Sequence, residues 1–243
     1  DADYVLCLTR VDEVNLIASQ QAHELGAKKI IARLRNQQYT TRDSIIKPEK
    51  FGIDLVIHPE KEACKEIVQL VRHSYATQVM DFEGGRVEMI GIRLDENSPI
   101  IGKSVSDICE EDQNFKFGII TVLRDGESHV PWSDYIFKFN DTAYFIVKTK
   151  WLESLMHLLG KEATPTNSII ILGGSKIGRS LAEELEKEMT VRLIERKRDK
   201  AEWLASHLKE TMIIHGDGTD VELLKSENIQ DADSFIAVTE SEQ

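Results

Sequence analysis

The sequence predicts an α/β protein in which two partial Rossmann-like, doubly wound parallel sheets flank a small α+β domain. Short continuous apolar runs alternate with segments whose apolar residues recur at helical spacing, which is typical of a parallel sheet. A glycine-rich turn at 173–178 joins one such run to the next helical segment. Between these stretches, alternating residues such as those at 87–94 predict half-buried antiparallel strands.

The N-terminal part, residues 1–79, supplies about three strands of such a sheet. Apolar runs predict strands at 4–8, 29–34 and 54–57. Apolar residues at helical spacing predict a helix that ends at Gly26, and another helix over 63–71. Because a doubly wound sheet usually has five or six strands, this part is predicted to be the C-terminal half of one lobe.

Residues 80–160 are predicted to form the small α+β domain, with strands over 87–94, 118–123 and 143–147. Asp125 and Gly126 make the dipeptide that a tight hairpin turn favours, since glycine adopts positive φ without steric cost. A helix that packs on this sheet is predicted from the stripe Trp151, Leu155, Leu158 and Leu159. The polar residues 161–167 are predicted to be a linker.

Residues 168–243 are predicted to be the N-terminal half of a second Rossmann-like lobe. The predicted strands are 169–172, 191–194, 212–214 and 235–238, with a helix over 177–185. Asp231-Ala232-Asp233 and the apolar run that ends in Thr239 repeat Asp1-Ala2-Asp3 and the run that ends in Thr9. We therefore expect a tandem duplication, in which the printed sequence starts within one copy and stops at the same place in the next.

Composition excludes several classes of function. Thirty Lys and Arg against 42 Asp and Glu give a net charge of −12, which argues against a nucleic-acid partner, because phosphate backbones are bound by cations. No apolar run approaches the ~18 residues of a membrane span, and the first residues do not resemble a signal peptide. Three cysteines without C-x-x-C spacing and seven scattered histidines predict neither disulfides nor a metal site, and they fit a reducing cytosol.

The first candidate site is the turn Gly173-Gly174-Ser175-Lys176-Ile177-Gly178. In a dinucleotide fingerprint the first glycine makes the turn, the second lets the backbone approach a pyrophosphate, and the third lets helix and strand pack closely. Ser175 stands in the place of the second glycine, where its Cβ narrows the approach and its hydroxyl can donate to a phosphate. The helix that begins here offers unpaired N–H groups to an anion. The alternative is an ordinary cap and turn.

Carboxylates at neighbouring strand ends extend this candidate site. Glu195 ends the next strand about 20 residues after the first glycine, where a carboxylate accepts hydrogen bonds from ribose and repels a 2'-phosphate. It favours NAD-like or adenosine ligands over NADP, although Arg196 and Arg198 weaken that preference. Asp217 follows the third strand at the same edge of the sheet. The alternative for Glu195 is a solvated carboxylate at the end of a strand.

Three further residues at strand ends have two interpretations each. Thr9 and Thr239 end equivalent strands, and each hydroxyl either faces a ligand or caps the strand end. Arg33 ends the next strand of the first half, and it either meets a phosphate or pairs with an acidic residue on the surface.

No catalytic set is predicted. The sequence has no G-x-S-x-G elbow, and the glycine turn lacks the Lys-Ser/Thr ending of a P-loop. None of the assigned segments places a proton donor against a nicotinamide. Binding without turnover is therefore the favoured interpretation, and an NAD-dependent oxidoreductase is the alternative.

The order of these segments resembles the bacterial TrkA family, the cytosolic nucleotide-binding regulatory subunits of Trk potassium uptake systems, which are built from two tandem RCK (KTN) units. The resemblance covers essentially the whole chain. It is carried by Asp1 to Asn15, Ile31 to Arg35, Ser98 to Ser104, Gly173 to Gly178, Leu193 to Arg196, Gly216-Asp217 and Asp231 to Thr239.

The resemblance implies a non-enzymatic regulator that binds NAD(H), with ATP or ADP as alternative ligands. It implies that residues 173–178 hold phosphates and ribose, that Glu195 binds ribose, and that Asp217 and Thr239 lie near adenine or ribose. It places Thr9, Arg10 and Arg33 in the site of the first unit, whose own glycine turn is not in the printed sequence. Ser175 departs from the family's usual glycine, which bears on the affinity of the second site.

The implied partner is a Trk-type membrane potassium transporter. A homo-oligomeric ring, a dimer or a tetramer, would gate that transporter from the cytoplasmic side, as a peripheral protein on the inner face of the membrane. An RCK-type regulator of another cation channel or of an antiporter is the remaining alternative.

The two halves are complementary. In a sheet of order 3-2-1-4-5-6, residues 168–243 supply strands 3-2-1-4 and residues 1–78 supply strands 4-5-6. Because each half exposes a hydrophobic sheet edge, we expect the halves to pair into composite domains, within one chain or between chains.

Overall fold

The computed structural model describes all residues except 1, 42, 112–115, 162–165 and 240–243. Asp1 of the repeat and residues 162–165 of the predicted linker thus lie outside the described residues. The chain divides into two compact units, Asp1–Lys65 and Glu66–Gln243. The finer boundaries at residues 80, 161 and 168 stay predictions.

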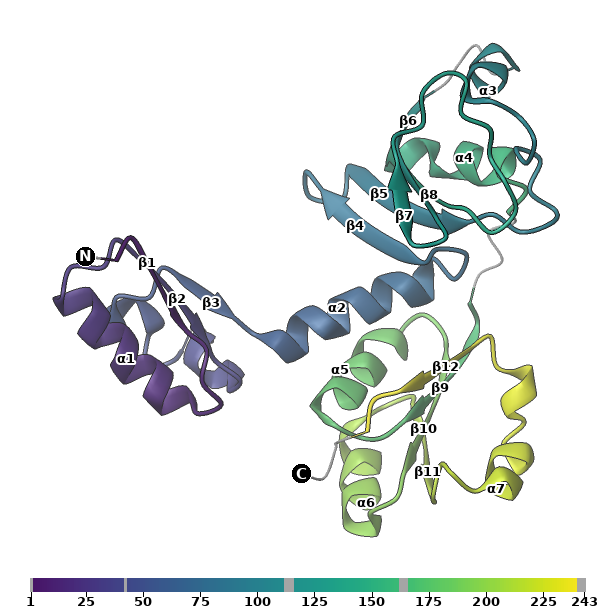
Figure 1. The fold of residues 1–243 in the computed structure, drawn as a ribbon. Coiled ribbons are helices and arrows are strands. Elements are labelled where there is room, and N and C mark those ends of the chain that lie inside the picture. The colour runs from purple at the N-terminus through teal and green to yellow at the C-terminus, as the bar shows by residue number, and fades with distance from the viewer. Residues whose placement is uncertain (1, 42, 112–115, 162–165, 240–243) are drawn as a thin grey trace. The chain divides into compact units, whose positions relative to one another are not determined.

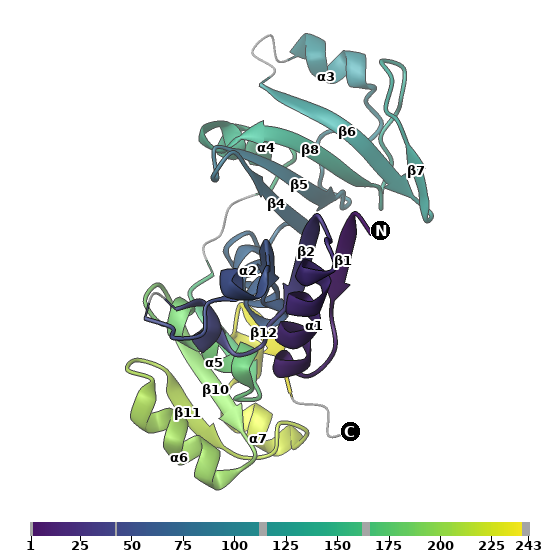
Figure 2. The ribbon, with the colours of Figure 1, turned by 90° about the vertical axis from the view of Figure 1, so that its left-hand side faces the viewer.

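The first unit is a three-stranded parallel sheet with one covering helix. Its strands are β1 (Tyr4–Cys7), β2 (Lys29–Arg33) and β3 (Leu55–Ile57), in the order β1-β2-β3. Helix α1 (Asp12–Glu24) lies on one face of this sheet (Figures 1 and 2). Gly26 follows the helix with a φ of 87°, as its place in the sequence predicts. Two 3-10 turns, η1 (Gln37–Thr40) and η2 (Pro48–Phe51), connect β2 to β3.

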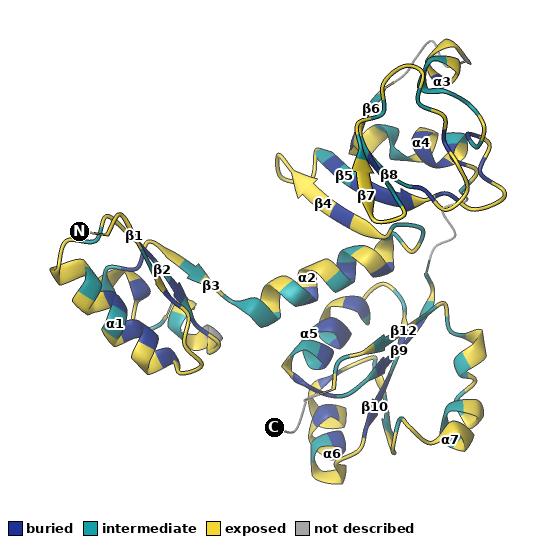
Figure 3. Cartoon of the chain, in the orientation of Figure 1, coloured by how far each residue is buried: buried dark blue, intermediate teal, exposed yellow. Residues whose placement is uncertain are grey.

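The core of the first unit lies between α1 and the sheet. It consists of Cys7, Leu16, Ile30, Ala32, Leu34 and Ile53. The strand β1 alternates, so that Cys7 is buried while Tyr4 and Leu6 are 68% and 59% exposed. Figure 3 shows buried and exposed residues alternating along α1 as well. The other face of the sheet is therefore apolar and open, as expected of strands that form half of a doubly wound sheet.

Helix α2 (Pro59–Arg72) spans the boundary between the two units. It contains the predicted segment 63–71 and begins earlier, at a proline, which is tolerated in the first turn because its missing N–H has no partner there. The small domain follows, with strands β4 (Gln78–Phe82), β5 (Val87–Arg93), β6 (Phe117–Arg124), β7 (Glu127–His129) and β8 (Thr142–Lys148). Its helices are α3 (Val105–Glu111) and α4 (Leu152–Leu158), the latter preceded by η3 (Thr149–Trp151).

The sheet of the small domain is antiparallel, with the order β4-β5-β8-β6-β7. The hairpin between β6 and β7 turns at Asp125 and Gly126, whose φ values of 53° and 83° confirm the predicted tight turn. Strand β4 and helix α3 were not predicted. Alternation in β4 is weak because Val79 and Met80 are adjacent apolar residues, and α3 is too short for its apolar spacing to be recognised.

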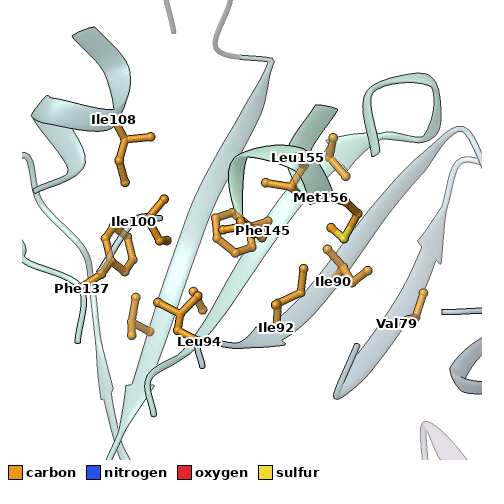
Figure 4. Packing of buried hydrophobic residues seen from close by; sticks show 14 residues of the cluster. Val79, Ile90, Ile92, Leu94, Ile100, Ile108, Phe137, Phe145, Leu155 and Met156 are labelled. Carbon is orange, nitrogen blue, oxygen red and sulfur yellow. The ribbon is translucent and has the colours of Figure 1, made fainter. Parts of the chain in front are cut away.

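A single cluster of buried apolar side chains holds the small domain together (Figure 4). Phe145 on β8 and Ile90 on β5 face Leu155 and Met156 on α4, and all four are at most 2% exposed. The predicted helix therefore packs on its own sheet. Close by, the fully buried carboxylate of Asp141 accepts two hydrogen bonds of 2.7 Å from the guanidinium of Arg124.

Residues 168–243 form a four-stranded parallel sheet. Its strands are β9 (Ser168–Leu172), β10 (Thr190–Glu195), β11 (Met212–His215) and β12 (Ser234–Ala237). The order β11-β10-β9-β12 confirms the predicted order 3-2-1-4. Helices α5 (Lys176–Leu185) and α6 (Arg198–His207) lie on one face, and α7 (Val221–Ser226) lies on the other, followed by η4 (Ile229–Asp231) (Figure 1).

The two halves of the predicted lobes belong to separate sheets, β1–β3 in one and β9–β12 in the other. The predicted pairing of these halves, within one chain or between chains, stays a prediction.

Candidate functional site

A cavity of about 350 Å³ opens at the carboxyl ends of β9, β10 and β11. Ligands of doubly wound sheets bind at this edge, next to the point where the strand order reverses. The strand order here is β11-β10-β9-β12, so the reversal lies between β9 and β12. The lining residues are Leu172, Gly173, Ser175, Ile194, Glu195, Arg196, Lys197, Lys200, Asp217, Gly218, Thr219 and Thr239.

The glycine turn forms one wall of the cavity, and its backbone is tightly packed. Gly173 has a φ of 101°, and a Cβ on it would lie 2.9 Å from Cα of Thr239. A Cβ on Gly174 would approach the Glu195 carboxylate to 3.0 Å. A Cβ on Gly178 would overlap the carbonyl oxygen of Gly173. Gly173 and Gly178 therefore require glycine because a Cβ would meet backbone atoms, whereas a Cβ on Gly174 would meet only the ends of the Leu204 and Glu195 side chains.

Ser175 is the N-cap of helix α5 and directly precedes its first residue, Lys176. Its hydroxyl oxygen accepts a hydrogen bond of 3.2 Å from the N–H of Gly178, and the residue is 9% exposed. The first-turn N–H groups of Lys176 and Ile177 have no carbonyl acceptor within the helix. They lie at the positive end of the helix dipole, which favours an anion at this place.

Glu195, at the end of β10, lies beside the turn and is 7% exposed. One carboxylate oxygen accepts from the N–H of Gly174 at 3.0 Å, and the other accepts from the N–H of Lys197 at 2.9 Å. Burial acts to raise the pKa of this carboxyl, but the backbone N–H donors of Lys197 and Gly174 and the charge of Lys200 outweigh it, so the pKa is lowered. Glu195 is therefore a carboxylate throughout the neutral range.

Cations surround Glu195 at the mouth of the cavity. The ammonium nitrogen of Lys200 lies 3.7 Å from the carboxylate, and Arg196 and Lys197 line the same cavity. An anionic ligand can thus enter a site in a chain whose net charge is −12. Arg196 was expected near Glu195 from the sequence, whereas Lys197 and Lys200 were not. Their position at the start of the helix that follows Glu195 could have revealed them, because such residues lie over the ends of the neighbouring strands.

Asp217 and Thr239 complete the cavity from the two outer strands. Asp217 follows β11, and one of its carboxylate oxygens accepts from the backbone N–H of Thr219 at 2.9 Å and from its hydroxyl at 2.8 Å. These two hydrogen bonds lower the pKa of Asp217. Thr239 follows β12, and its backbone packs against Gly173. The structure therefore brings Gly173 and Ser175 of the turn together with Glu195, Asp217 and Thr239, which lie far from the turn in the sequence.

Thr9, Arg10 and Arg33 belong to the first unit, at the carboxyl ends of its own strands. The side chain of Asn15, which is fully buried, accepts from the N–H and the hydroxyl of Thr9 and donates to the carbonyl oxygens of Thr9 and Arg33. Asn15 thus ties the ends of β1 and β2 together. Arg33 is half-buried and Arg10 is exposed.

In the described part of the chain, no three His, Cys, Asp or Glu side chains are arranged to hold a metal ion. Among the same residues, no helix is both long and apolar enough to cross a bilayer.

The half-lobe 168–243 is expected to lose stability in acid. Burial acts to raise the pKa of Glu186 and Glu195, but hydrogen bonds from backbone N–H groups, and from the Thr211 hydroxyl to Glu186, outweigh it. Backbone N–H donors likewise lower the pKa values of Asp217 and Asp233. A lowered folded-state pKa adds stability above the unfolded-state value of ~4, and this stability is lost as the pH falls through the folded-state value. Urea unfolding should show a level free energy above about pH 5 and a decline below it. Glu186→Gln should make the decline shallower, and a free energy that rises on acidification would contradict this assignment.

The chain matches the family model described as the TrkA-N domain over residues 1–59 and 169–243. It is 31% identical over 244 residues to the Trk system potassium uptake protein TrkA of Halomonas elongata, covering 100% of this chain and 53% of that protein. It is 35% identical over 243 residues to a TrkA homolog of Archaeoglobus fulgidus, covering 100% of this chain and 54% of that protein. The chain thus spans about half the length of these relatives.

A solved structure shares the fold. The GsuK channel bound to NAD superposes with a TM-score of 0.63 at 19% identity, covering 99% of this chain and 41% of that one. At this identity the similarity supports the α/β architecture alone.

Proposed function

Because the chain belongs to the TrkA-N domain family, we propose that it is a nucleotide-binding regulatory part of a potassium uptake system. The observation that carries the proposal is the cavity at the carboxyl edge of the sheet, where the glycine turn, Glu195 and a rim of cations meet. A helix N-terminus for phosphate and a carboxylate for sugar are the two features that a nucleotide requires of such a site.

The expected ligand is NAD(H), with ATP or ADP as the alternatives. The first-turn amides of Lys176 and Ile177 and the turn at Gly173, Gly174 and Gly178 would face the phosphates. Glu195 would accept from ribose hydroxyls, and Asp217 and Thr239 would lie near ribose or adenine. The cations Arg196, Lys197 and Lys200 give the cavity the positive charge that a polyphosphate needs. Thr9, Arg10 and Arg33 would contribute to a separate site of the first unit.

Regulation, in this proposal, requires no chemistry on the ligand. A nucleotide shifts the arrangement of the chain's parts only if it binds the two arrangements with different affinity. A homo-oligomeric ring on the cytoplasmic face would pass that shift to a membrane transporter subunit. The names of the relatives, which are potassium uptake proteins, support this partner.

Nucleotide binding is tested by calorimetric titration of the chain with NADH, NAD, ATP and ADP. Ser175→Asp places a carboxylate at the helix N-terminus, where it caps the helix at least as well as serine but repels phosphate. We expect at least a tenfold loss of affinity with unchanged thermal stability. The repulsion between two like charges ~4 Å apart exceeds the free energy that corresponds to a tenfold change in affinity. Ser206→Asp, which adds the same charge at an exposed position on α6, should bind as the wild type does.

Failure of the wild-type chain to bind any of the four nucleotides would refute the site. Steady oxidation of NADH by the purified chain would instead favour an oxidoreductase. The regulatory role is tested with the whole protein, by measuring potassium flux into vesicles that contain the transporter, with and without the nucleotide that binds. A flux that does not respond to the nucleotide would refute regulation but not binding.

A further inference from the structure

Glu195 faces the back of the glycine turn as well as the cavity. Its Oε2 atom accepts from the N–H of Gly174 at 3.0 Å, in a buried hydrogen bond that links the ends of β10 and β9. Its Oε1 atom accepts from the N–H of Lys197, at the start of α6. Both oxygens are thus engaged by the protein itself before any ligand is present.

Two other amides of the turn are also engaged by the protein. The N–H of Gly173 donates to the carbonyl oxygen of Ile194 at 2.8 Å, and the N–H of Gly178 donates to the hydroxyl of Ser175. Glu195 supplies a side-chain acceptor that reaches the turn from the neighbouring strand. The carboxylate also lies close to Gly174 itself, since a Cβ there would be 3.0 Å from the same oxygen.

From this geometry we propose that Glu195 is a positioning residue, which sets the backbone of the glycine turn for the phosphates in addition to any contact with the sugar. The inference rests on the proposed function for its effect on ligand binding, but not for its effect on the turn. Without the carboxylate, the N–H of the buried Gly174 has no acceptor, and an unsatisfied buried donor is costly. The turn must then shift to reach water, and the amides of Lys176 and Ile177 shift with it.

The turn itself is tested in the absence of ligand by measuring amide hydrogen exchange with NMR. Glu195→Ala should speed the exchange of Gly174 by about tenfold or more, while Gly173, whose bond to Ile194 is retained, should change little. Glu195→Gln keeps one oxygen that can accept from Gly174, and it should hold the exchange to within about threefold of wild type. If the alanine variant does not fold, the exchange of Gly174 is measured in Glu195→Gln instead. Unchanged exchange of Gly174 in Glu195→Ala would overturn the proposal.

A matched control is available at the other end of helix α5. The carboxylate of Glu186 also accepts hydrogen bonds from backbone N–H groups, those of Glu210 and Thr211, at 3.1 and 3.0 Å. Glu186→Ala should therefore lower the stability of the half-lobe without speeding the exchange of Gly174. If it speeds that exchange as much as Glu195→Ala does, the effect is general loosening, and the positioning role fails.

Ligand binding separates positioning from sugar contact. The probes are ADP and 2',3'-dideoxy-ADP, which lacks the ribose hydroxyls. If Glu195 positions the turn, Glu195→Ala should lower the affinity for both probes by a similar factor, at least fivefold. Glu195→Gln should then restore much of the affinity for the dideoxy probe. A loss confined to ADP would show that Glu195 acts through the sugar alone. If the wild type binds neither probe or any other nucleotide, the proposed function fails, and the exchange of Gly174 alone decides the role of Glu195.

Discussion

Gly178→Ala is expected to destabilise the half-lobe 168–243 by about 3 kcal/mol or more and to abolish nucleotide binding. The new Cβ would overlap the carbonyl oxygen of Gly173 and lie 3.2 Å from a methyl group of Val238. Alanine is the better helix former by ~1 kcal/mol, but that gain cannot offset a clash with a backbone atom. The turn must move away from the helix, and the cavity wall moves with it. Urea unfolding and nucleotide titration measure the two effects.

Gly216→Ala is the control for this prediction. Its Cβ would meet Cδ2 of Leu223 at 2.5 Å, which is the end of a side chain that can turn away. We expect a cost below about 1 kcal/mol and retained binding. Equal costs for the two glycine variants would show that the packing of the turn against α5 is not as tight as the geometry indicates.

Arg124→Leu is expected to destabilise the small domain by about 3 kcal/mol. The side chain of Asp141 is 0% exposed, and Arg124 is its cationic partner through two hydrogen bonds of 2.7 Å. Removal of the guanidinium leaves a buried carboxylate without a counter-charge, which costs far more than the loss of a surface pair. Urea unfolding gives the size of the effect, and hydrogen exchange at core amides such as that of Phe145 assigns it to the small domain.

Two further variants define the cause of this loss. Arg198→Leu removes an arginine whose pair with Glu202 is exposed on both sides, at 77% and 66%, and it should change stability by less than about 0.5 kcal/mol. Adding Asp141→Asn to Arg124→Leu removes the buried charge and should recover part of the stability. If Arg124→Leu lowers the free energy of unfolding no more than Arg198→Leu does, the buried pair of Arg124 and Asp141 does not stabilise the small domain as its geometry implies.

Much of the fold follows from local pattern. Apolar runs such as Ile169 to Leu172, the glycine turn after them, and the repeat that ends in Thr239 were enough to predict the order of β11, β10, β9 and β12. Continuous apolar runs are recognised because strands of a parallel sheet are buried on both faces. Strand β4 was missed because it lies at the edge of the small-domain sheet, where alternating polar residues such as Asp81 are tolerated.

The candidate site was predicted in outline and completed only by the fold. Gly173, Glu195 and Asp217 were recognised because each follows a predicted strand, and parallel strands end at one edge of the sheet. Lys197 and Lys200 were missed because they lie at the N-cap and in the first turn of the helix after β10. Such residues reach a site only through the direction in which the helix leaves the sheet.

The sequence by itself determined the class of fold, the strand order of each half-lobe and the turn at which a nucleotide is expected, because these depend on residues near one another in the chain. Only the tertiary structure decided that Glu195 bonds the backbone of Gly174 and that Asp141 is buried against Arg124. Such contacts join residues far apart in sequence, and they arise from packing geometry that periodicity and composition do not encode.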